Sequence, residues 1–264
     1  MNIVKHKTPT GILQNYVTNF SYKIFDVAEL SIMPARTDQF MEFYLEGRYR
    51  VVDKINNSEF DSPSSIFIGH QTQYNWDLKL EGKYKQFFIH FTPNGFYRIF
   101  NIPMKEFTNR ALDLHDFIND EIKHLHNKLC ACDSFDSMII LAEEFLIRQL
   151  SCAKPLKDNL DEIINYINLN KGMVDLSKIV SQSNLCLRQF ERKFDEQIGV
   201  SPKTFMKKLR LNYIIQLKKS NPNLNWTELT YTANYFDQAH MIKDFKALTG
   251  LPPSKYFQQF TLLH

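Results

Sequence analysis

The spacing of hydrophobic and polar positions changes along this chain at about residue 94. Before that point, short apolar runs rich in aromatic and β-branched residues alternate with turn residues, which is typical of strands in a small sandwich or barrel. The pattern does not fix the strand order. The predicted strands are Ile32–Met33 before Pro34, Phe40–Leu45 before Gly47, Tyr49–Val52 before an Asn56–Ser58 turn, Ser65–Ile68 before Gly69, and Gln86–Phe91 before Pro93.

Beyond residue 94 the apolar residues recur every three to four positions, as they do in helices. Phe96, Ile99 and Phe100 predict a short helix that ends before Pro103, and Ser134 can cap a helix that runs to about Leu150. This second helix could form a dimer surface or pack on its own barrel. Residues 151–155, Ser-Cys-Ala-Lys-Pro, break the helical pattern and predict a linker.

The chain is therefore expected to have two domains and an α+β fold. Residues 1–152 would form a β-rich sensor or dimerisation domain, a cupin-like barrel or sandwich with trailing helices. Residues 153–264 would form an all-α domain.

The all-α part begins with a helix that follows Asn159 and ends by Gly172, and a helix-turn-helix pattern comes next in residues 176–194. A short apolar face is interrupted at Ser183–Asn184 and resumes at Leu185, and asparagine tolerates the left-handed backbone that a tight turn needs. Two short helices with the second carrying long polar donors outward are what a helix-turn-helix requires.

A second such unit follows a long basic helix. Gly199 suits a helix end, Ser201 an N-cap and Pro202 a first helical position, and the helix would run to Ser220. Asn234 then stands at a second turn, and the exit sequence at residues 250–254 echoes the one at residues 199–202. A duplicated unit with matching exits is a specific signal, whereas a single helix-turn-helix pattern is a weak one.

Residues 157–260 resemble the AraC/XylS-type DNA-binding domain of bacterial transcription regulators. The stretch 188–210, RQFERKFDEQIGVSPKTFMKKLR, resembles the family's first recognition helix and its exit, and 235–257, YFDQAHMIKDFKALTGLPPSKYF, resembles its C-terminal signature. Residues 69–78 and 90–114 resemble a sensor domain found in the same family. The resemblance implies a bacterial, cytoplasmic, sequence-specific DNA binder whose two units address successive major-groove faces.

The chain departs from the family's pattern at five positions, where the family usually has alanine, alanine, glycine, serine and phenylalanine. These are Val180, Thr230, Asn234, Ala239 and Met241.

Arginine and glutamine carry the donors that guanine and adenine edges accept, so the exposed positions of the two second helices are the candidate DNA contacts. In the first unit these are Arg188, Gln189 and Arg192 for bases, with Lys193 and Lys203 for phosphates. In the second unit they are Gln238, His240 and Lys243, and Asp237 is expected to cap the recognition helix. For each of these residues, the alternative to a DNA contact is a place on a helix face that only meets solvent.

The net charge supports this assignment only after it is divided along the chain. The whole sequence carries 32 basic and 29 acidic residues, or +3. Residues 1–152 carry 16 basic against 19 acidic residues, residues 153–264 carry 16 against 10, and residues 176–255 carry 13 against 6, a net +7. The positive excess therefore lies on the duplicated unit, where a phosphate backbone would run.

The aromatic residues of the N-terminal half suggest a small-molecule pocket, with Phe43, Tyr74, Trp76 and Phe88 as the chosen lining residues. Ordinary core packing is the alternative for each of them. A metal-dependent cupin enzyme with a DNA-binding appendage is the rival function, and its metal would be lost on mutation of His70 or His90. We expect no metal, because the helical spacing of His124 and His126 points them apart. We expect no other cofactor and no catalysis, because no Gly-rich phosphate loop, Ser nucleophile elbow or Cys-His arrangement is apparent.

The remaining expectations concern location and partners. The four cysteines show no CxxC pair and favour reduced thiols. No apolar stretch of 18 residues predicts a membrane span and no signal peptide is visible, so a cytoplasmic location is expected. Double-stranded DNA is the expected partner, and RNA polymerase, a small-molecule effector and a second copy of the chain are further candidates. A third reading is a pure interaction module whose N-terminal half only dimerises.

Overall fold

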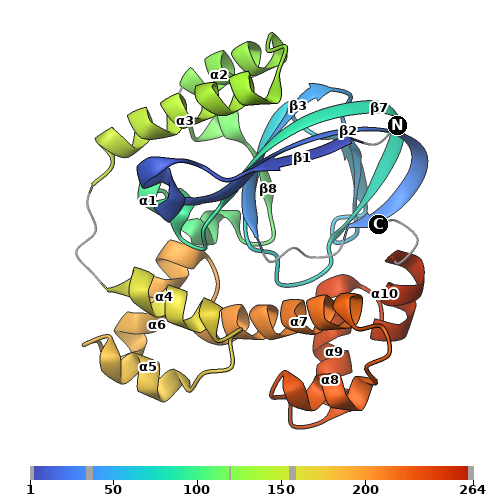
Figure 1. The fold of residues 1–264 in the computed structure, drawn as a ribbon, viewed down its shortest axis with the longest axis vertical. Helices are drawn as coiled ribbons and strands as arrows, with labels where there is room; N and C mark the ends of the chain where they lie inside the picture. The colour runs from blue at the N-terminus through green and yellow to red at the C-terminus, as the bar shows by residue number, and fades with distance from the viewer. Residues whose placement is uncertain (1–2, 34–37, 119, 155–158, 261–264) are drawn as a thin grey trace. The chain divides into compact units, whose positions relative to one another are not determined.

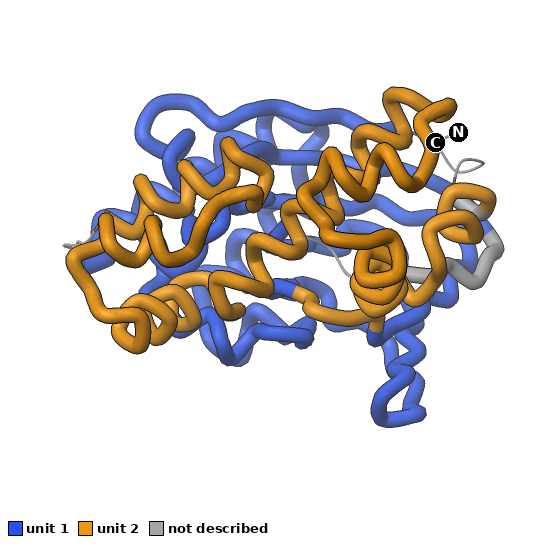
Figure 2. Tube along the Cα trace, turned by 90° about the horizontal axis from the view of Figure 1, so that it is seen from below, with its two compact units in different colours: residues 1–33, 38–70, 75–156 blue, residues 34–37, 71–74, 157–264 orange. Residues whose placement is uncertain are grey.

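The structure of the protein is a computed structural model, which describes residues 3–33, 38–118, 120–154 and 159–260. The chain separates into two compact units, coloured in Figure 2: one contains residues 1–33, 38–70 and 75–156, and the other contains residues 34–37, 71–74 and 157–264. Pro34 and Pro155, which we expected to end a strand and to lie in a linker, fall outside the described residues. All four cysteines are free.

The first unit is built on one antiparallel sheet of eight described strands (Figure 1). Its order is β1-β2-β7-β3-β6-β8, with β4 pairing β7 and β5 pairing β4. The strands are β1 (Ile3–Lys7), β2 (Val17–Met33), β3 (Gln39–Glu46), β4 (Arg50–Asp53), β5 (Ser58–Asp61), β6 (Ser65–Ile68), β7 (Trp76–Phe91) and β8 (Ala111–Asp113).

Strands β2 and β7 are the long central pair of this sheet. They run together from Val17 opposite Phe91 to Met33 opposite Trp76. The other edge of β7 is shared, because its last residues pair with β3 and its first four pair with β4. The predicted strand at residues 86–91 is thus only the end of a 16-residue strand. Strands β1, β5, β8 and most of β2 were not predicted.

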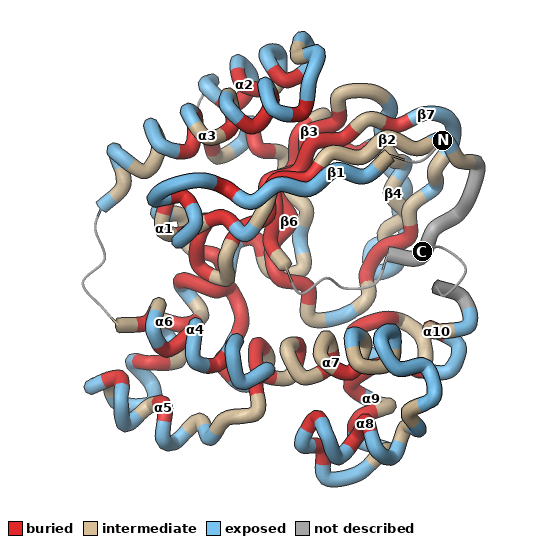
Figure 3. Tube along the Cα trace, in the orientation of Figure 1, coloured by how far each residue is buried: buried red, intermediate tan, exposed pale blue. Residues whose placement is uncertain are grey.

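Both faces of the sheet are buried around β3, which explains why apolar residues occupy successive positions on either side of the buried Glu42 (Figure 3). Successive side chains of a strand point to opposite faces. Met41 and Phe43 belong to a core cluster that also contains side chains of the helices. Phe40 and Tyr44 belong to a second cluster with Ile66, Ile68 and Phe88.

Helices cover the first of these faces. They are α1 (Gly95–Phe100), α2 (Glu121–Cys130) and α3 (Phe135–Cys152), and the short 3-10 helices are η1 (Gly11–Asn15), η2 (Met104–Phe107) and η3 (Leu114–Asp116). Ser134 caps α3 as predicted, since its hydroxyl accepts the N–H of Ser137 at 3.1 Å. The helix continues through Cys152, so the predicted linker begins later than expected.

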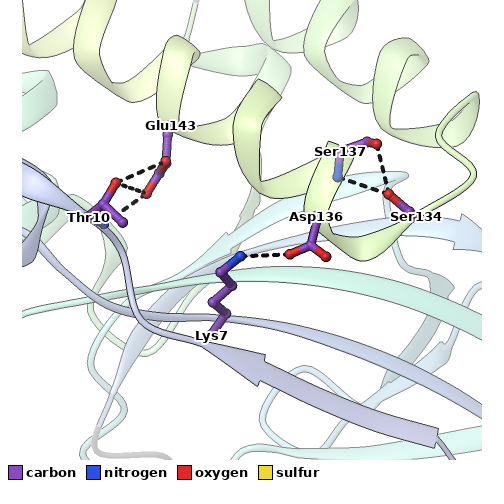
Figure 4. A network of polar contacts seen from close by, with 6 residues as sticks. All are labelled: Lys7, Thr10, Ser134, Asp136, Ser137 and Glu143. Atoms are coloured by element: carbon purple, nitrogen blue, oxygen red, sulfur yellow. Dashed lines mark hydrogen bonds and ion pairs between the residues drawn. The ribbon is translucent and has the colours of Figure 1, made fainter.

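Polar contacts fix α3 to the N-terminal segment of its own domain (Figure 4). Lys7 donates to Asp136 at 2.7 Å, and the backbone N–H of Thr10 donates to Glu143 at 2.9 Å. The apolar face of α3 joins the main core through residues such as Phe145 and Leu146. Of the two roles expected for this helix, packing on its own sheet is therefore the one that the structure shows. Ile140 and Ile147 remain exposed on its surface.

The second unit is helical and contains α4 (Leu160–Leu169), α5 (Leu176–Gln182), α6 (Leu187–Ile198), α7 (Pro202–Ser220), α8 (Trp226–Thr232), α9 (Gln238–Thr249) and α10 (Pro253–Phe260). It has two separate apolar clusters, and α7 belongs to both. Phe205 and Met206 at its start pack with α4, α5 and α6, whereas Leu211 and Ile214 farther along pack with α8, α9 and α10. A single helix therefore joins two small cores, as the duplicated pattern predicts. No helix in the described part of the chain combines the length and apolarity needed to cross a bilayer.

Candidate nucleic-acid interface

The two helix-turn-helix units turn at equivalent asparagines. Asn184 lies between α5 and α6 with a φ of 56°, and Asn234 lies between α8 and α9 with a φ of 57°. This left-handed conformation is uncommon for residues other than glycine, and asparagine is among the few that adopt it. Both turns were predicted from these residues.

The second helix of each unit buries one face and exposes the other. Phe190 and Phe194 of α6 are fully buried, as are Met241 and Phe245 of α9. Both helices end at a left-handed glycine, Gly199 with a φ of 86° and Gly250 with a φ of 77°. These correspondences make α6 and α9 the candidate recognition helices.

On α6, Arg188 and Arg192 are exposed and lie one turn apart, so both side chains can reach the same surface. Gln189 is also exposed, but its Oε1 accepts the N–H of Cys186 at 3.2 Å and so closes the first turn of the helix. That bond occupies part of the acceptor capacity of Oε1, so its amide N–H groups are the clearer candidates for a base. Lys193 is half-buried beside them, and Lys203 is exposed at the start of α7.

On α9, Asp237 is the N-cap that the sequence predicted, because its Oδ1 accepts the N–H of His240 at 2.7 Å. Lys243 is exposed. Gln238 is half-buried, and its Oε1 accepts the hydroxyl of Thr227 on α8 at 3.3 Å. His240 is exposed, yet its Nε2 lies 3.5 Å from Asp244.

Sequence reasoning missed Lys246 as a candidate on this helix. It is exposed and lies three residues after Lys243, on the same side of α9. The spacing from Lys243 was a signal that could have identified it.

Several cations of α7 are engaged within the protein. Lys207 Nζ lies 3.2 Å from Asp244, whose carboxylate also accepts the Tyr235 hydroxyl at 3.5 Å. Burial and the nearby Asp244 charge raise the pKa of Tyr235, so its hydroxyl stays protonated and can donate. The Arg210 guanidinium lies over the Tyr235 ring at 4.9 Å and donates to the carbonyl of Asn234 at 3.4 Å. These contacts tie α7 to the second helix-turn-helix unit.

Two more cations of α7 are also buried or bonded within the protein. Lys208 is only 2% exposed. Lys218 donates to the carbonyls of Pro222 and Leu224, each at 2.6 Å. Fewer cations of α7 are therefore left to meet phosphates than the sequence suggested.

The departures from the family's pattern fit their positions in the structure. Thr230 is 1% exposed and satisfies its hydroxyl by donating to the carbonyl of Trp226 at 2.6 Å. Val180 packs against the first cluster and Met241 lies at the centre of the second. Ala239 is exposed, so it removes a polar group from the surface of α9.

The predicted effector-pocket residues do not gather at one place. A cavity of about 240 Å³ lies in the first unit, and Trp76 lines it. Phe43 instead lies in the main core, and Phe88 lies in the smaller cluster with Tyr44. Tyr74 belongs to the short segment grouped with the second unit and does not line the cavity.

Two of the histidines considered for a metal, His90 and His126, make other contacts. His90 Nδ1 lies 3.0 Å from Asp38 and its Nε2 lies 2.9 Å from the Ser21 hydroxyl. No sequence pattern indicated this Ser-His-Asp chain, in which Ser21 is fully buried. His126 Nε2 lies 3.0 Å from the carbonyl of Tyr44, and burial lowers the pKa of its imidazole. Within the described residues no group of three or more His, Cys, Asp or Glu could hold a metal ion.

Comparisons with known proteins agree with this architecture. Residues 180–259 match a family of helix-turn-helix domains, and residues 6–113 match a domain of unknown function (DUF6597). No curated protein sequence matches the chain.

Two solved structures of ToxT from Vibrio cholerae strain SCE256 share the fold. An apo variant matches with a TM-score of 0.51 at 14% identity and covers 90% of this chain and 97% of that one. The wild-type protein bound to an unsaturated fatty acid matches with a TM-score of 0.50 at 15% identity, covering 90% and 94%. A β-rich domain followed by a helical domain is thus common to both proteins. Residues 180–259, which contain the second helices of both helix-turn-helix units, thus match a helix-turn-helix domain, and the chain as a whole shares its two-part fold with ToxT.

Proposed function

We propose that the chain regulates transcription by reading a specific DNA sequence with α6 and α9, and that it does so without catalysis, in the cytoplasm. The observation that carries this proposal is the pair of equivalent helices, each with a buried apolar face and an exposed face that carries cations. Two such helices about one DNA turn apart, roughly 34 Å, would meet successive major-groove faces.

The exposed residues have different expected roles. Arg188 and Arg192 present guanidinium groups, which pair with guanine edges in two parallel hydrogen bonds, and the free amide of Gln189 can add a donor. Lys193 and Lys203 are assigned to phosphates. In the second unit Lys243 is the leading contact. Gln238 and His240 remain candidates, although both also bond to neighbouring residues.

Fluorescence anisotropy with duplexes captured from the chain's own genome tests the division of roles. Arg192→Ala should lose discrimination between the captured site and a random duplex by about 10-fold or more, because a bidentate base contact contributes roughly 1–3 kcal/mol. Lys203→Ala should weaken both duplexes about equally. Lys123→Ala removes an exposed charge from α2 in the other unit and should change neither. Equal losses on both duplexes for Arg192→Ala and Lys203→Ala would show that the assignments are wrong.

We propose further that the N-terminal domain controls DNA binding through a small-molecule effector or through self-association. The cavity lined by Trp76 supports the first route, and the exposed Ile140 and Ile147 of α3 support the second. Control by a ligand requires that the ligand bind two states of the protein with different affinity. Light scattering with and without DNA tests for a dimer. RNA polymerase stays a candidate partner on the family resemblance alone.

A further inference from the structure

The cavity of the first unit has a chemically distinctive wall. Its volume of about 240 Å³ lies below the roughly 300–1,000 Å³ of pockets for drug-sized ligands, so its occupant is small. Tyr44, Tyr49 and Trp76 line it, together with aliphatic side chains of β4, β6, β7 and β8. Tyr44 and Tyr49 meet edge to face with ring centroids 5.2 Å apart. Such a wall suits an aromatic ring.

One polar side chain of this wall, that of Asn75, is buried without hydrogen bonds to its amide from the described residues. It is 2% exposed, and neither Oδ1 nor Nδ2 of its amide has a hydrogen-bond partner in the described part of the chain. Its backbone is held, because its carbonyl accepts the N–H of Lys54 at 2.8 Å. Buried polar groups are hydrogen-bonded in most proteins, and an unmade bond costs stability. An amide that lines a cavity in this condition can be satisfied by a ligand that carries donors and acceptors.

The ionisable groups on the wall favour a cation over an anion. Glu42 is 3% exposed, lines the cavity and accepts Gln86 Nε2 at 2.6 Å. Asp53 is a second carboxylate on the wall. Arg110 is the one basic residue among the described lining residues, and its exposed guanidinium donates to the carbonyl of Glu106 at 3.3 Å. A carboxylate ligand would meet these two acids, whereas an ammonium group would be attracted by them and by the aromatic faces.

We propose that this cavity binds a small aromatic amine, with its ring against Tyr44, Tyr49 and Trp76, its ammonium group toward Glu42, and a polar substituent on the Asn75 amide. The unsaturated fatty acid of the related ToxT structure belongs to a different chemical class, since it is a long anion. The proposed binding depends only on the geometry of the cavity, whereas an effect of the ligand on transcription rests on the proposed function.

Isothermal titration of the full chain with matched probes tests the proposal. Tyramine is the amine probe, and 3-(4-hydroxyphenyl)propionate has the same ring with a carboxylate in place of the amine. We expect tyramine to bind at least 10-fold more tightly than the carboxylate. Glu42→Gln should remove this preference, whereas Glu81→Gln, which removes an exposed charge outside the cavity, should keep it.

Asn75→Leu separates a binding role from a structural one. The variant should abolish tyramine binding and raise the melting temperature of the free protein, because it removes an unsatisfied amide. Tighter or equal binding of the carboxylate, no binding of tyramine at millimolar concentration to folded protein, or unchanged binding by Asn75→Leu would each overturn the proposal. The titration contains no DNA, so such a result would leave the DNA-binding function standing, and anisotropy with tyramine added then measures the regulatory effect.

Discussion

Single residues at the turns and helix starts determine where the helices of the second unit begin and end. Asn234 holds a φ of 57° and is exposed, so its backbone conformation matters more than its packing. Asn234→Ala should destabilise the protein by about 1 kcal/mol, because alanine has no means to offset the cost of the left-handed region. The melting temperature should fall by about 2–4 °C. Asn223→Ala, at an exposed position nearby without a positive φ, is the control and should leave it unchanged.

The cap of α9 predicts a separate effect. Asp237→Ala removes the acceptor of the His240 N–H and should cost about 1 kcal/mol, whereas Asp237→Asn keeps an acceptor and should cost less. Because α9 presents Lys243, the alanine variant should also weaken DNA binding. Thermal melts and anisotropy on the same samples measure both effects. A DNA defect of equal size in both variants would point to the charge of Asp237 and not to its capping bond.

Asp175, the cap of α5, makes stability depend on pH. Hydrogen bonds from the hydroxyl and backbone N–H of Ser177 lower the pKa of its carboxyl. A group whose pKa is lower in the folded state stabilises the protein above its unfolded pKa, near pH 4, and this contribution is lost as the pH falls through the folded pKa. Asp175→Asn should therefore lower the melting temperature at neutral pH, and the difference from wild type should shrink as the pH falls below 4. A difference that is the same at every pH would contradict this assignment.

At the scale of whole elements, α7 shows that cations of one helix have different roles, some bonding within the protein and others remaining exposed. Lys207 bonds to Asp244, a carboxylate only 8% exposed, whereas Lys203 is exposed four residues earlier. Lys207→Met should cost about 1–2 kcal/mol of stability, less than a fully buried pair because Lys207 keeps contact with water. Lys203→Met is the matched control and should lower DNA affinity without this loss. Urea denaturation followed by circular dichroism measures both variants.

Elements defined by local signals were predicted from the sequence, and those defined by distant partners were not. The turn at Asn184, the cap at Asp237 and the exit at Gly199 depend on neighbours within a few residues. The length of β7 depends on β2, which lies some sixty residues away, and its middle is exposed and charged, so no apolar pattern marks it.

The candidate sites likewise contain features that local sequence patterns predict and features that they do not. The exposed faces of α6 and α9 follow from helical spacing. The role of Lys207 and the unsatisfied amide of Asn75 depend on tertiary contacts that no short pattern encodes.

At the scale of the whole molecule, the charge of residues 176–255 sets a limit on the salt dependence of DNA binding. This stretch holds 13 cations, and Lys207, Lys208, Arg210 and Lys218 are buried or bonded within the protein. At most nine are then left for phosphates. Each neutralised phosphate contributes about −0.9 to the slope of log affinity against log salt concentration, so the slope per bound chain should be no steeper than about −8. Anisotropy across a salt series measures this slope, and a value near −12 would mean that the α7 cations leave their internal partners when DNA binds.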